Sequence, residues 1–265
     1  MKKSNGLVRQ GRRVWRLSHL LVHILIGAIA AQTLLRGSRA VPPRTARQRA
    51  VVRWWMRRLC NIVGMRITVH GERPGHGVLL VANHVSWLDI PAVMSVLDVD
   101  FVSKHEVRRW PVVGTMAERA GTLFILRGGR EAAATTADSM AARLRQPYNV
   151  IVFPEGTTTD GTGVRRFHAR LYQAAVQANV PVQALAIRYP GQLGPGGIAP
   201  FVDDQSLFNH LWRLMGEKRL TTELHFCRPL APTGERRVLA ERTREHVCRA
   251  LGLDTDASLP RRAVH

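Results

Sequence analysis

The chain opens with a long apolar segment that has basic residues on both sides. Residues 17–35 carry no charged side chain, and as a helix they would extend about 28 Å, close to the apolar thickness of a bilayer. Small and polar side chains recur in this segment at every fourth position and share one helix face: His19, His23, Gly27 and Ala31. The pattern predicts a membrane-embedded helix whose small, polar face packs on another helix.

Two other interpretations of this segment are open. Ala28-Ile29-Ala30 resembles the cleavage site of a secretory signal, and a long apolar helix can also be buried in a soluble protein. The basic flanks make burial in a soluble protein the least favoured of the three. Because both flanks are basic, the positive-inside rule gives no direction of crossing. A helix that enters the membrane and returns to the same side would explain this.

A second amphipathic helix is predicted over residues 44–66. Apolar side chains form a stripe along it, and arginines occupy much of the remaining surface: Val51, Trp54, Trp55, Leu59 and Ile62 on the stripe, and Arg49, Arg53, Arg57 and Arg58 outside it. Indole rings and cations favour the depth of lipid headgroups, so the pattern favours a helix at the membrane interface. The alternative is a helix that packs on the protein core. Residues 37–43 are the expected turn between the two helices.

From Glu72 onward, short apolar runs alternate with helical periodicity. They predict strands at 78–82, 123–126, 150–153, 182–187 and 223–226, and helices at 130–145, 168–177 and 235–251. This alternation predicts an α/β fold, a single domain with a mixed, largely parallel sheet covered by helices. The expected organisation is a basic N-terminal pair of membrane-anchoring helices (1–66), the α/β domain (67–253) and a loose C-terminal tail (254–265).

Composition and charge narrow the class of protein. With 265 residues, 45% hydrophobic and 22% charged, the chain is neither disordered nor a polytopic membrane protein. Its three cysteines form no CxxC pair, which argues against a disulfide framework and a cysteine-rich zinc site. The net charge is +20, and residues 1–71 hold 15 basic and no acidic side chains. This excess predicts an anionic partner, either nucleic acid or a membrane surface.

The first candidate for chemistry follows the strand predicted at 78–82. His84 lies where ligands bind in open α/β sheets, and imidazole accepts a proton near neutral pH. Asp89 is five residues away, so the two side chains meet only if the chain turns between them. Pro91 favours a helix that starts near Asp89, with His84 in the preceding loop. The carboxylate would then orient the imidazole as a general base. The alternative is that Asp89 or Ser86 only caps the helix.

Two further elements follow predicted strands. The turn at residues 153–157, Phe-Pro-Glu-Gly-Thr, carries Glu155, which could bind a ligand hydroxyl, anchor the loop or face solvent. Arg127 ends another strand beside two glycines, where a guanidinium can bind a phosphate or form a surface salt bridge. Together the three elements place a base, its orienting acid, an acidic turn and a phosphate-binding arginine at the ends of three strands.

These elements resemble the motifs of the glycerolipid acyltransferases, particularly bacterial 1-acyl-glycerol-3-phosphate acyltransferases. The family's four motifs are matched in order and spacing: Asn-His-x-x-x-x-Asp by Asn83, His84 and Asp89; Gly-x-x-Phe-Ile-x-Arg by Gly121, Phe124, Ile125 and Arg127; Phe-Pro-Glu-Gly-Thr by 153–157; and a Val-Pro strand start by Val180 and Pro181. The resemblance spans about residues 50–230. One departure is Phe167-His168-Ala169-Arg170, where the family often has Phe-Lys-x-Gly, and it leaves the acceptor open.

The resemblance implies a role for each matched residue. His84 is the base and Asp89 orients it. The acceptor side includes Arg127, which would bind a phosphate, and Glu155 and Gly156 of the acidic turn. Thr157 of the same turn is a further substrate-binding candidate. Lys104 lies in a stretch that resembles the family's Lys-containing segment, where it would hold an anionic ligand or be a solvated surface lysine. Pro181 is linked to the acyl-donor side. No metal ligand and no cofactor is implied, since a thioester is already activated.

The predicted function is therefore an O-acyltransferase. It would move a fatty acyl group from acyl carrier protein or coenzyme A to a lysophospholipid hydroxyl, without a covalent intermediate. The expected acceptor is 1-acyl-glycerol-3-phosphate, which gives phosphatidic acid, and another lysolipid such as lyso-ornithine lipid is the alternative. The expected location is the cytoplasmic face of the inner membrane, which disfavours the secretory signal. A basic nucleic-acid-binding protein is a weaker alternative, because the basic segment is interleaved with an apolar run and no nucleic-acid-binding signature is present. A lipid-binding protein without turnover is a further rival.

Overall fold

The computed structural model describes residues 2–34, 45–125, 130–202, 205–232 and 235–255. Within them, seven strands form one sheet in the order β1-β7-β6-β2-β5-β3-β4. Neighbouring strands are parallel except β6 and β7. The strands are β1 (Met65–His70), β2 (Leu79–Ala82), β3 (Val99–Lys104), β4 (Leu123–Ile125), β5 (Asn149–Val152), β6 (Val182–Arg188) and β7 (Leu220–Phe226). The predicted mixed, largely parallel α/β fold is confirmed.

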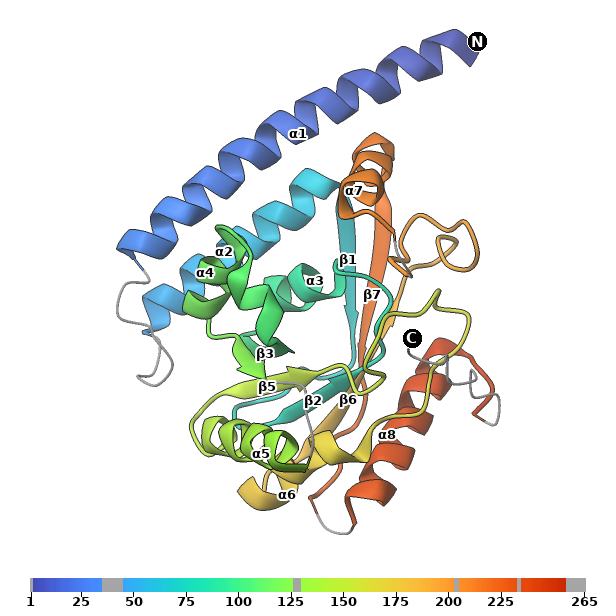
Figure 1. The fold of residues 1–265 in the computed structure, drawn as a ribbon. Coiled ribbons are helices and arrows are strands. Elements are labelled where there is room, and N and C mark those ends of the chain that lie inside the picture. Colours follow the sequence, from blue (N-terminus) through green and yellow to red (C-terminus); the bar gives the residue numbers. More distant parts are fainter. Residues whose placement is uncertain (1, 35–44, 126–129, 203–204, 233–234, 256–265) are drawn as a thin grey trace.

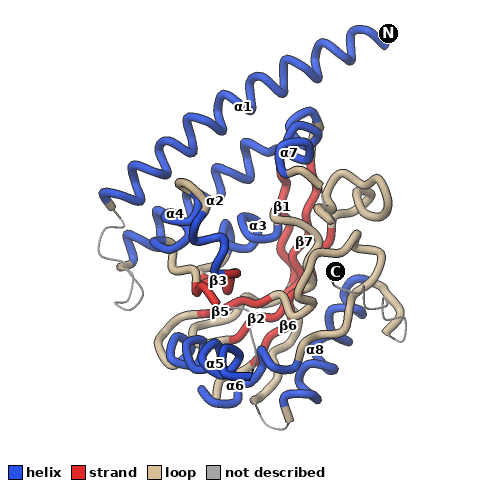
Figure 2. The backbone as a smooth tube through the Cα atoms, in the orientation of Figure 1, coloured by secondary structure: helices blue, strands red, loops and turns tan. Residues whose placement is uncertain are grey.

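Helices cover both faces of the sheet. They are α1 (Lys2–Thr33), α2 (Ala46–Val63), α3 (Asp89–Val96), α4 (Val113–Arg119), α5 (Arg130–Leu144), α6 (Gln173–Ala178), α7 (Leu207–Gly216) and α8 (Arg236–Leu251), with the 3-10 helices η1 (His105–Arg109) and η2 (Ala169–Tyr172). One hydrophobic cluster joins the sheet to α2, α3 and α7, and a second joins it to α5, α6 and α8. Figures 1 and 2 show α5, α6 and α8 on one side of the sheet, with α1 the outermost element on the other.

The sequence predicted five of the seven strands found in the described residues. Each of the five predicted strands is present, while β1, β3, α4 and α7 were missed. Strand β3 was hidden by Asp100, a fully buried carboxylate that receives a 2.9 Å hydrogen bond from Arg143. Strand β1 alternates apolar and polar residues over only six positions. It contains residue 66, so the sheet begins inside the predicted N-terminal unit. The helix predicted at 168–177 is divided into η2 and α6.

The predicted small face of α1 is confirmed by its packing on α2. His23 stacks on Trp55 with ring centroids 4.5 Å apart, its Nε2 lies 3.0 Å from the Trp55 carbonyl, and the Trp55 indole N–H donates to the His23 carbonyl. A side chain on Gly27 would collide with this indole. The opposite face of α1 exposes large apolar residues, including Leu21, Leu25 and Ile29. By length and composition, residues 6–33 suit a membrane span.

Helix α2 packs on the protein core as well as on α1. Val52, Cys60 and Val63 are buried in the cluster that includes α3. The alternative of a core-packed helix is therefore confirmed for this face, whereas Trp54 is half exposed. The sequence pattern was ambiguous because the helix carries two apolar faces, one for each neighbour. The turn expected at 37–43 lies outside the described residues.

Several of the N-terminal arginines bind protein rather than an external anion. Arg12 donates to the Gly216 carbonyl at 2.8 Å, and Arg16 donates to the Glu217 carbonyl at 2.7 Å. Arg9 pairs with the Glu217 carboxylate at 2.8 Å. These groups lie at the C-terminus of α7, where exposed carbonyls favour cations. Part of the basic excess that predicted an anionic partner thus fastens α1 to α7.

Candidate active site

The carboxyl ends of β6, β2, β5, β3 and β4 lie at one edge of the sheet, because these five strands are parallel. His84 follows β2 and the Phe153–Thr157 turn follows β5. These strands are neighbours in the sheet, so the first and third sequence motifs meet there. Side chains from separate loops can act on one ligand at such an edge.

His84 and Asp89 form the predicted pair. Nδ1 of His84 lies 2.8 Å from Oδ2 of Asp89, and Asp89 is the first residue of α3, as the position of Pro91 predicted. The imidazole stacks on Phe153 with ring centroids 3.9 Å apart and planes inclined by 8°. Because a carboxylate only accepts, Nδ1 carries the proton, and Nε2 keeps its lone pair. The His84 side chain is 18% exposed while Asp89 is fully buried, so the base is open to ligand and its partner is not.

Four groups hold the Asp89 carboxylate in place. Oδ2 accepts the backbone N–H groups of Val85 and Ser86 at 2.8 and 3.0 Å, in addition to the imidazole. Oδ1 accepts the hydroxyl of Tyr189 at 2.6 Å. Burial, and next the Asp89 carboxylate, raise the pKa of Tyr189 well above its usual value, so the hydroxyl stays protonated and donates. The sequence analysis missed Tyr189, although it directly follows β6 at the same edge of the sheet.

The Glu155 carboxylate connects two loops. It is 4% exposed, Oε1 accepts the backbone N–H of His84 at 2.8 Å, and Oε2 accepts that of Arg165 at 2.9 Å. Burial raises its pKa to about 7, against the opposing effect of these two hydrogen bonds. The resemblance implied that Glu155 contacts the acceptor. In the structure its oxygens face the protein backbone, so it fixes the His84 loop against the loop that carries Arg165.

Asn83 fastens the same loop to the neighbouring strand. Its side chain donates to the Ile187 carbonyl at 2.9 Å and accepts the Ile187 N–H at 2.8 Å. Both amide positions are thus satisfied by one residue of β6, and the side chain is buried. The Asn of the first motif therefore sets where β2 ends and where the His84 loop begins.

Some of the other predicted site residues lie at the same end of the strands as His84, and others do not. Lys104 ends β3, and Gly156 and Thr157 follow β5. All three are exposed and lie at the same carboxyl ends of the strands as His84. Gly156 has a φ of 75°, a conformation that favours glycine. Pro181 precedes β6, and its carbonyl accepts from the Leu79 N–H. It therefore lies at the amino ends of the strands, away from His84. Arg127 lies outside the described residues.

Ser86 has no partner that would activate it. Its side chain is fully buried, and its Oγ has no hydrogen-bond partner among the described residues. His84 directs Nδ1 to Asp89 instead. A serine nucleophile needs an adjacent base, so the geometry agrees with direct transfer.

Helix α7 and the loop that precedes it pack against the turn that holds the pair. The indole N–H of Trp87 donates to Nδ1 of His210 at 3.0 Å, and His210 in turn contacts the Ile198 carbonyl at 3.1 Å. Burial lowers the pKa of His210, which keeps the ring neutral and able to accept from the indole. The Phe201 N–H donates to the Val85 carbonyl at 2.9 Å. The sequence analysis did not assign His210 because its partners lie far away in the chain.

The arrangement can abstract a proton from a ligand hydroxyl through Nε2 of His84, while the buried carboxylate stabilises the imidazolium that forms. A cluster of three metal-ligating residues among the described residues lies elsewhere, on β1 and β7.

Comparisons with known proteins identify the family of this chain. The family model described as Acyltransferase matches residues 66–188. The lyso-ornithine lipid O-acyltransferase of Pseudomonas aeruginosa is 38% identical over 242 residues, covering 91% of this chain and 93% of that protein. The 1-acyl-sn-glycerol-3-phosphate acyltransferase of Neisseria gonorrhoeae is 33% identical over 228 residues, covering 85% and 89%.

A solved structure supports the fold separately. The crystal structure of PlsC from Thermotoga maritima, a 1-acyl-sn-glycerophosphate acyltransferase, superposes with a TM-score of 0.64 over 95% of this chain and 98% of that one, at 20% identity. At this identity the likeness concerns the fold alone. Relatives that match nearly end to end, together with the family model over the sheet that carries His84 and Asp89, establish that this chain belongs to the acyltransferase family.

Proposed function

We propose that this chain is a lysolipid O-acyltransferase in which His84 is the general base. The observation that carries the proposal is the pairing of a partly exposed imidazole with a buried carboxylate at 2.8 Å. The roles of the two groups differ in their exposure: Asp89 is buried and held in position by its hydrogen bonds, while Nε2 of His84 is left for the ligand. The likeness to named lysolipid acyltransferases supports the substrate class.

The reaction is a direct transfer. Nε2 of His84 takes the proton from the acceptor hydroxyl as that oxygen attacks the thioester carbonyl. The C–S bond then breaks, and the proton on the imidazolium goes to the departing thiolate. General base catalysis of this kind contributes about 10²–10⁴-fold. The two balanced steps need no added oxidant, nucleotide or metal.

Glu155 and Tyr189 act as positioning residues in this proposal. Glu155 holds the backbone of His84, and Tyr189 holds the carboxylate that orients the ring. Lys104, Gly156, Thr157 and Arg127 remain proposed contacts of the acceptor. Pro181, at the amino end of β6, would affect the donor side only through the position of this strand.

Lyso-ornithine lipid is the favoured acceptor. The relative that acts on this lipid by name is 38% identical, against 33% and 34% for two relatives named for 1-acyl-glycerol-3-phosphate. Residues 167–170 also depart from the Phe-Lys-x-Gly that the family often has after the third motif, which leaves the acceptor open. The preference thus reverses the acceptor expected from the four motifs alone, and 1-acyl-glycerol-3-phosphate becomes the second candidate.

The membrane location completes the proposal. A lysolipid partitions into the bilayer, at about 0.8 kcal/mol per buried CH₂, so the enzyme must work at that surface. The exposed apolar face of α1 suits contact with lipid, and the donor would be acyl carrier protein or coenzyme A thioester from the cytoplasm. Residues 1–66 would anchor the α/β domain at the cytoplasmic face of the inner membrane.

The test is a matrix of acceptors and donors offered to purified full-length protein. Lyso-ornithine lipid and 1-acyl-glycerol-3-phosphate are each supplied in mixed micelles with an acyl carrier protein thioester and with a coenzyme A thioester. We expect the highest kcat/KM with lyso-ornithine lipid, and loss of transfer in His84→Ala for every acceptor. A faster reaction with 1-acyl-glycerol-3-phosphate would overturn the acceptor assignment, and an active His84→Ala would overturn the base.

A further inference from the structure

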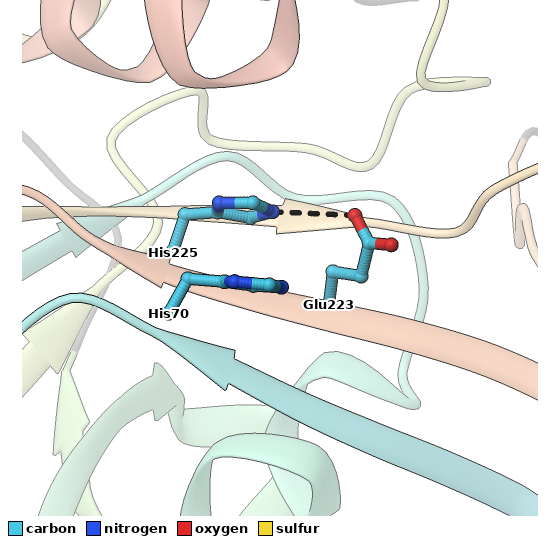
Figure 3. Close-up of side chains that lie close together, drawn as sticks. All are labelled: His70, Glu223 and His225. Atoms are coloured by element: carbon cyan, nitrogen blue, oxygen red, sulfur yellow. Dashed lines mark hydrogen bonds and ion pairs between the residues drawn. The ribbon is translucent and has the colours of Figure 1, made fainter.

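The open face of the β1–β7 pair carries a cluster that the acyl transfer does not use. Strand β1 is the edge of the sheet and pairs in parallel with β7, so His70 lies directly opposite His225. Alternate residues of β7 are buried, and those between them, including Glu223 and His225, are only partly covered. The three side chains stand on this same face (Figure 3).

The three side chains lie close together, and their backbones are held by the sheet. The rings of His70 and His225 are stacked, with centroids 4.3 Å apart and planes inclined by 13°. Nε2 of His225 lies 3.2 Å from Oε2 of Glu223, and one ligand atom from each of the three residues lies within 4.8 Å of the others. Figure 3 shows both imidazoles extending toward the Glu223 side of the cluster. Backbone hydrogen bonds of the sheet hold all three attachment points.

We propose that His70, Glu223 and His225 form a binding site for a divalent transition-metal ion of the zinc type. Two imidazoles and one carboxylate are a ligand set that Zn²⁺ accepts, with a fourth position left for water. Bonds of about 2.0–2.2 Å at tetrahedral angles separate ligand atoms by about 3.3–3.6 Å. His225 and Glu223 are already at about this spacing, and no pair of ligand atoms is more than 4.8 Å apart, so we expect side-chain rotations to bring the three groups around one ion with the strands unmoved.

One neighbouring charge opposes the ion. Nη1 of Arg188, on β6, lies 3.7 Å from Oε2 of Glu223, which is longer than a hydrogen bond. Its side chain is 46% exposed and can turn into solvent. Arg66, two residues before Thr68 on β1, is a second cation on this face and is opposite Thr221, one same-face pair further from the cluster. Arg188 should therefore weaken metal binding without blocking it.

A bound ion would join the edge strand to the sheet. In the part of the chain that the structure describes, strand β1 has a single strand partner, β7, whereas the inner strands are paired on both sides. A cross-strand ion at the ends of β1 and β7 adds a second attachment for the edge, independent of the chemistry at His84. The site is separate from the proposed acyl transfer and does not rest on it.

The test uses the untagged full-length protein in detergent. Zn²⁺ is titrated calorimetrically, and Co²⁺ is titrated by its visible absorption, which reports the ligand geometry. We expect one equivalent to bind. His70→Ala and His225→Ala should each weaken binding by at least the about 10–100-fold that loss of an outer-shell partner costs. Glu223→Gln should weaken it as well, and Arg188→Ala should strengthen it, a direction that general destabilisation does not produce.

His76→Ala is the matched control, because His76 is an exposed histidine in the loop after β1 and outside the cluster. It should bind Zn²⁺ like the wild type. Wild-type affinity and stoichiometry in the His70→Ala/His225→Ala double variant would overturn the site. Circular dichroism and acyl transfer check that the variants are folded, and should a histidine variant unfold, the opposite effects of Glu223→Gln and Arg188→Ala decide the matter.

Discussion

Two histidine–carboxylate pairs in this molecule have different surroundings. His84 and Asp89 are 2.8 Å apart, and Asp89 is fully buried beneath a partly exposed ring. His225 and Glu223 are 3.2 Å apart, and both are 24% exposed. Asp89 is also held by two backbone N–H groups and a hydroxyl, whereas Glu223 lies within 4.8 Å of a second imidazole, that of His70.

The difference shows that burial of the carboxylate decides what such a pair can do. A buried, fully hydrogen-bonded carboxylate fixes one tautomer and one direction of the ring, which suits proton transfer. An open carboxylate beside two imidazoles leaves several lone pairs near one point, which suits a cation. The residue types are nearly the same, and the partners around them are not.

The largest expected difference between the two pairs is the effect on acyl transfer of replacing His84 or His225 by alanine. His84→Ala should lower kcat/KM for acyl transfer by about 10²–10⁴-fold, because the base is removed. His225→Ala should leave it within about twofold, since general base catalysis does not involve this ring. Initial rates with the purified full-length proteins measure both. Equal losses in the two variants would contradict the assignment.

The carboxylates give the second largest contrast. Asp89→Asn should lower kcat by about 10²–10⁴-fold, since an amide can donate to Nδ1 and favour the wrong tautomer. Glu223→Gln is the matched control and should keep the wild-type kcat. An Asp89→Asn enzyme with wild-type kcat would show that Asp89 serves only to hold the backbone of the turn before α3.

Glu155 extends the comparison to pH. Its pKa is raised from 4.5 to about 7 by burial, so the folded protein binds this proton more tightly than the unfolded chain. The associated stability is fully present below about pH 4.5 and is lost as the pH rises through 7. The loss amounts to about 3 kcal/mol, at 1.36 kcal/mol per pKa unit.

Denaturant unfolding at pH 5 and pH 8 tests this linkage. The free energy of unfolding should fall between these pH values by less in Glu155→Gln than in the wild type, because glutamine does not titrate. The difference between the two proteins removes the contribution of all other groups. An identical fall in both proteins would mean that Glu155 is already ionised at pH 5.

The smallest expected effect is that of removing the Tyr189 hydroxyl. Tyr189→Phe removes a hydrogen bond to a buried carboxylate, worth about 1.5–3 kcal/mol of stability, and should lower kcat with little change in KM. Tyr172→Phe is the control, since the Tyr172 hydroxyl is also buried but lies 2.6 Å from the neutral Thr243. It should lose stability while keeping kcat. A kcat that falls equally in both variants would mean that Tyr189 acts only through stability.

The sequence pattern predicted a feature correctly where the residues that cause the feature lie within one short segment. The strand before His84, the turn forced before Pro91 and the first residue of α3 are encoded within a few residues, and the structure has all three. The four-residue repeat of small and polar positions likewise predicted which face of α1 packs on another helix. In contrast, β3 was missed because its buried Asp100 depends on Arg143, more than forty residues later.

The sequence by itself determined the α/β class, the family and the His84–Asp89 pair, since apolar periodicity and a five-residue loop are local. The tertiary structure alone decided that Glu155 binds backbone groups and that Tyr189 holds Asp89 from 100 residues away. It alone also brought His70 against His225 and the arginines of α1 against α7. Strand order and helix packing set these approaches, because contacts between distant segments depend on how the whole chain folds and leave no periodic signal in either segment.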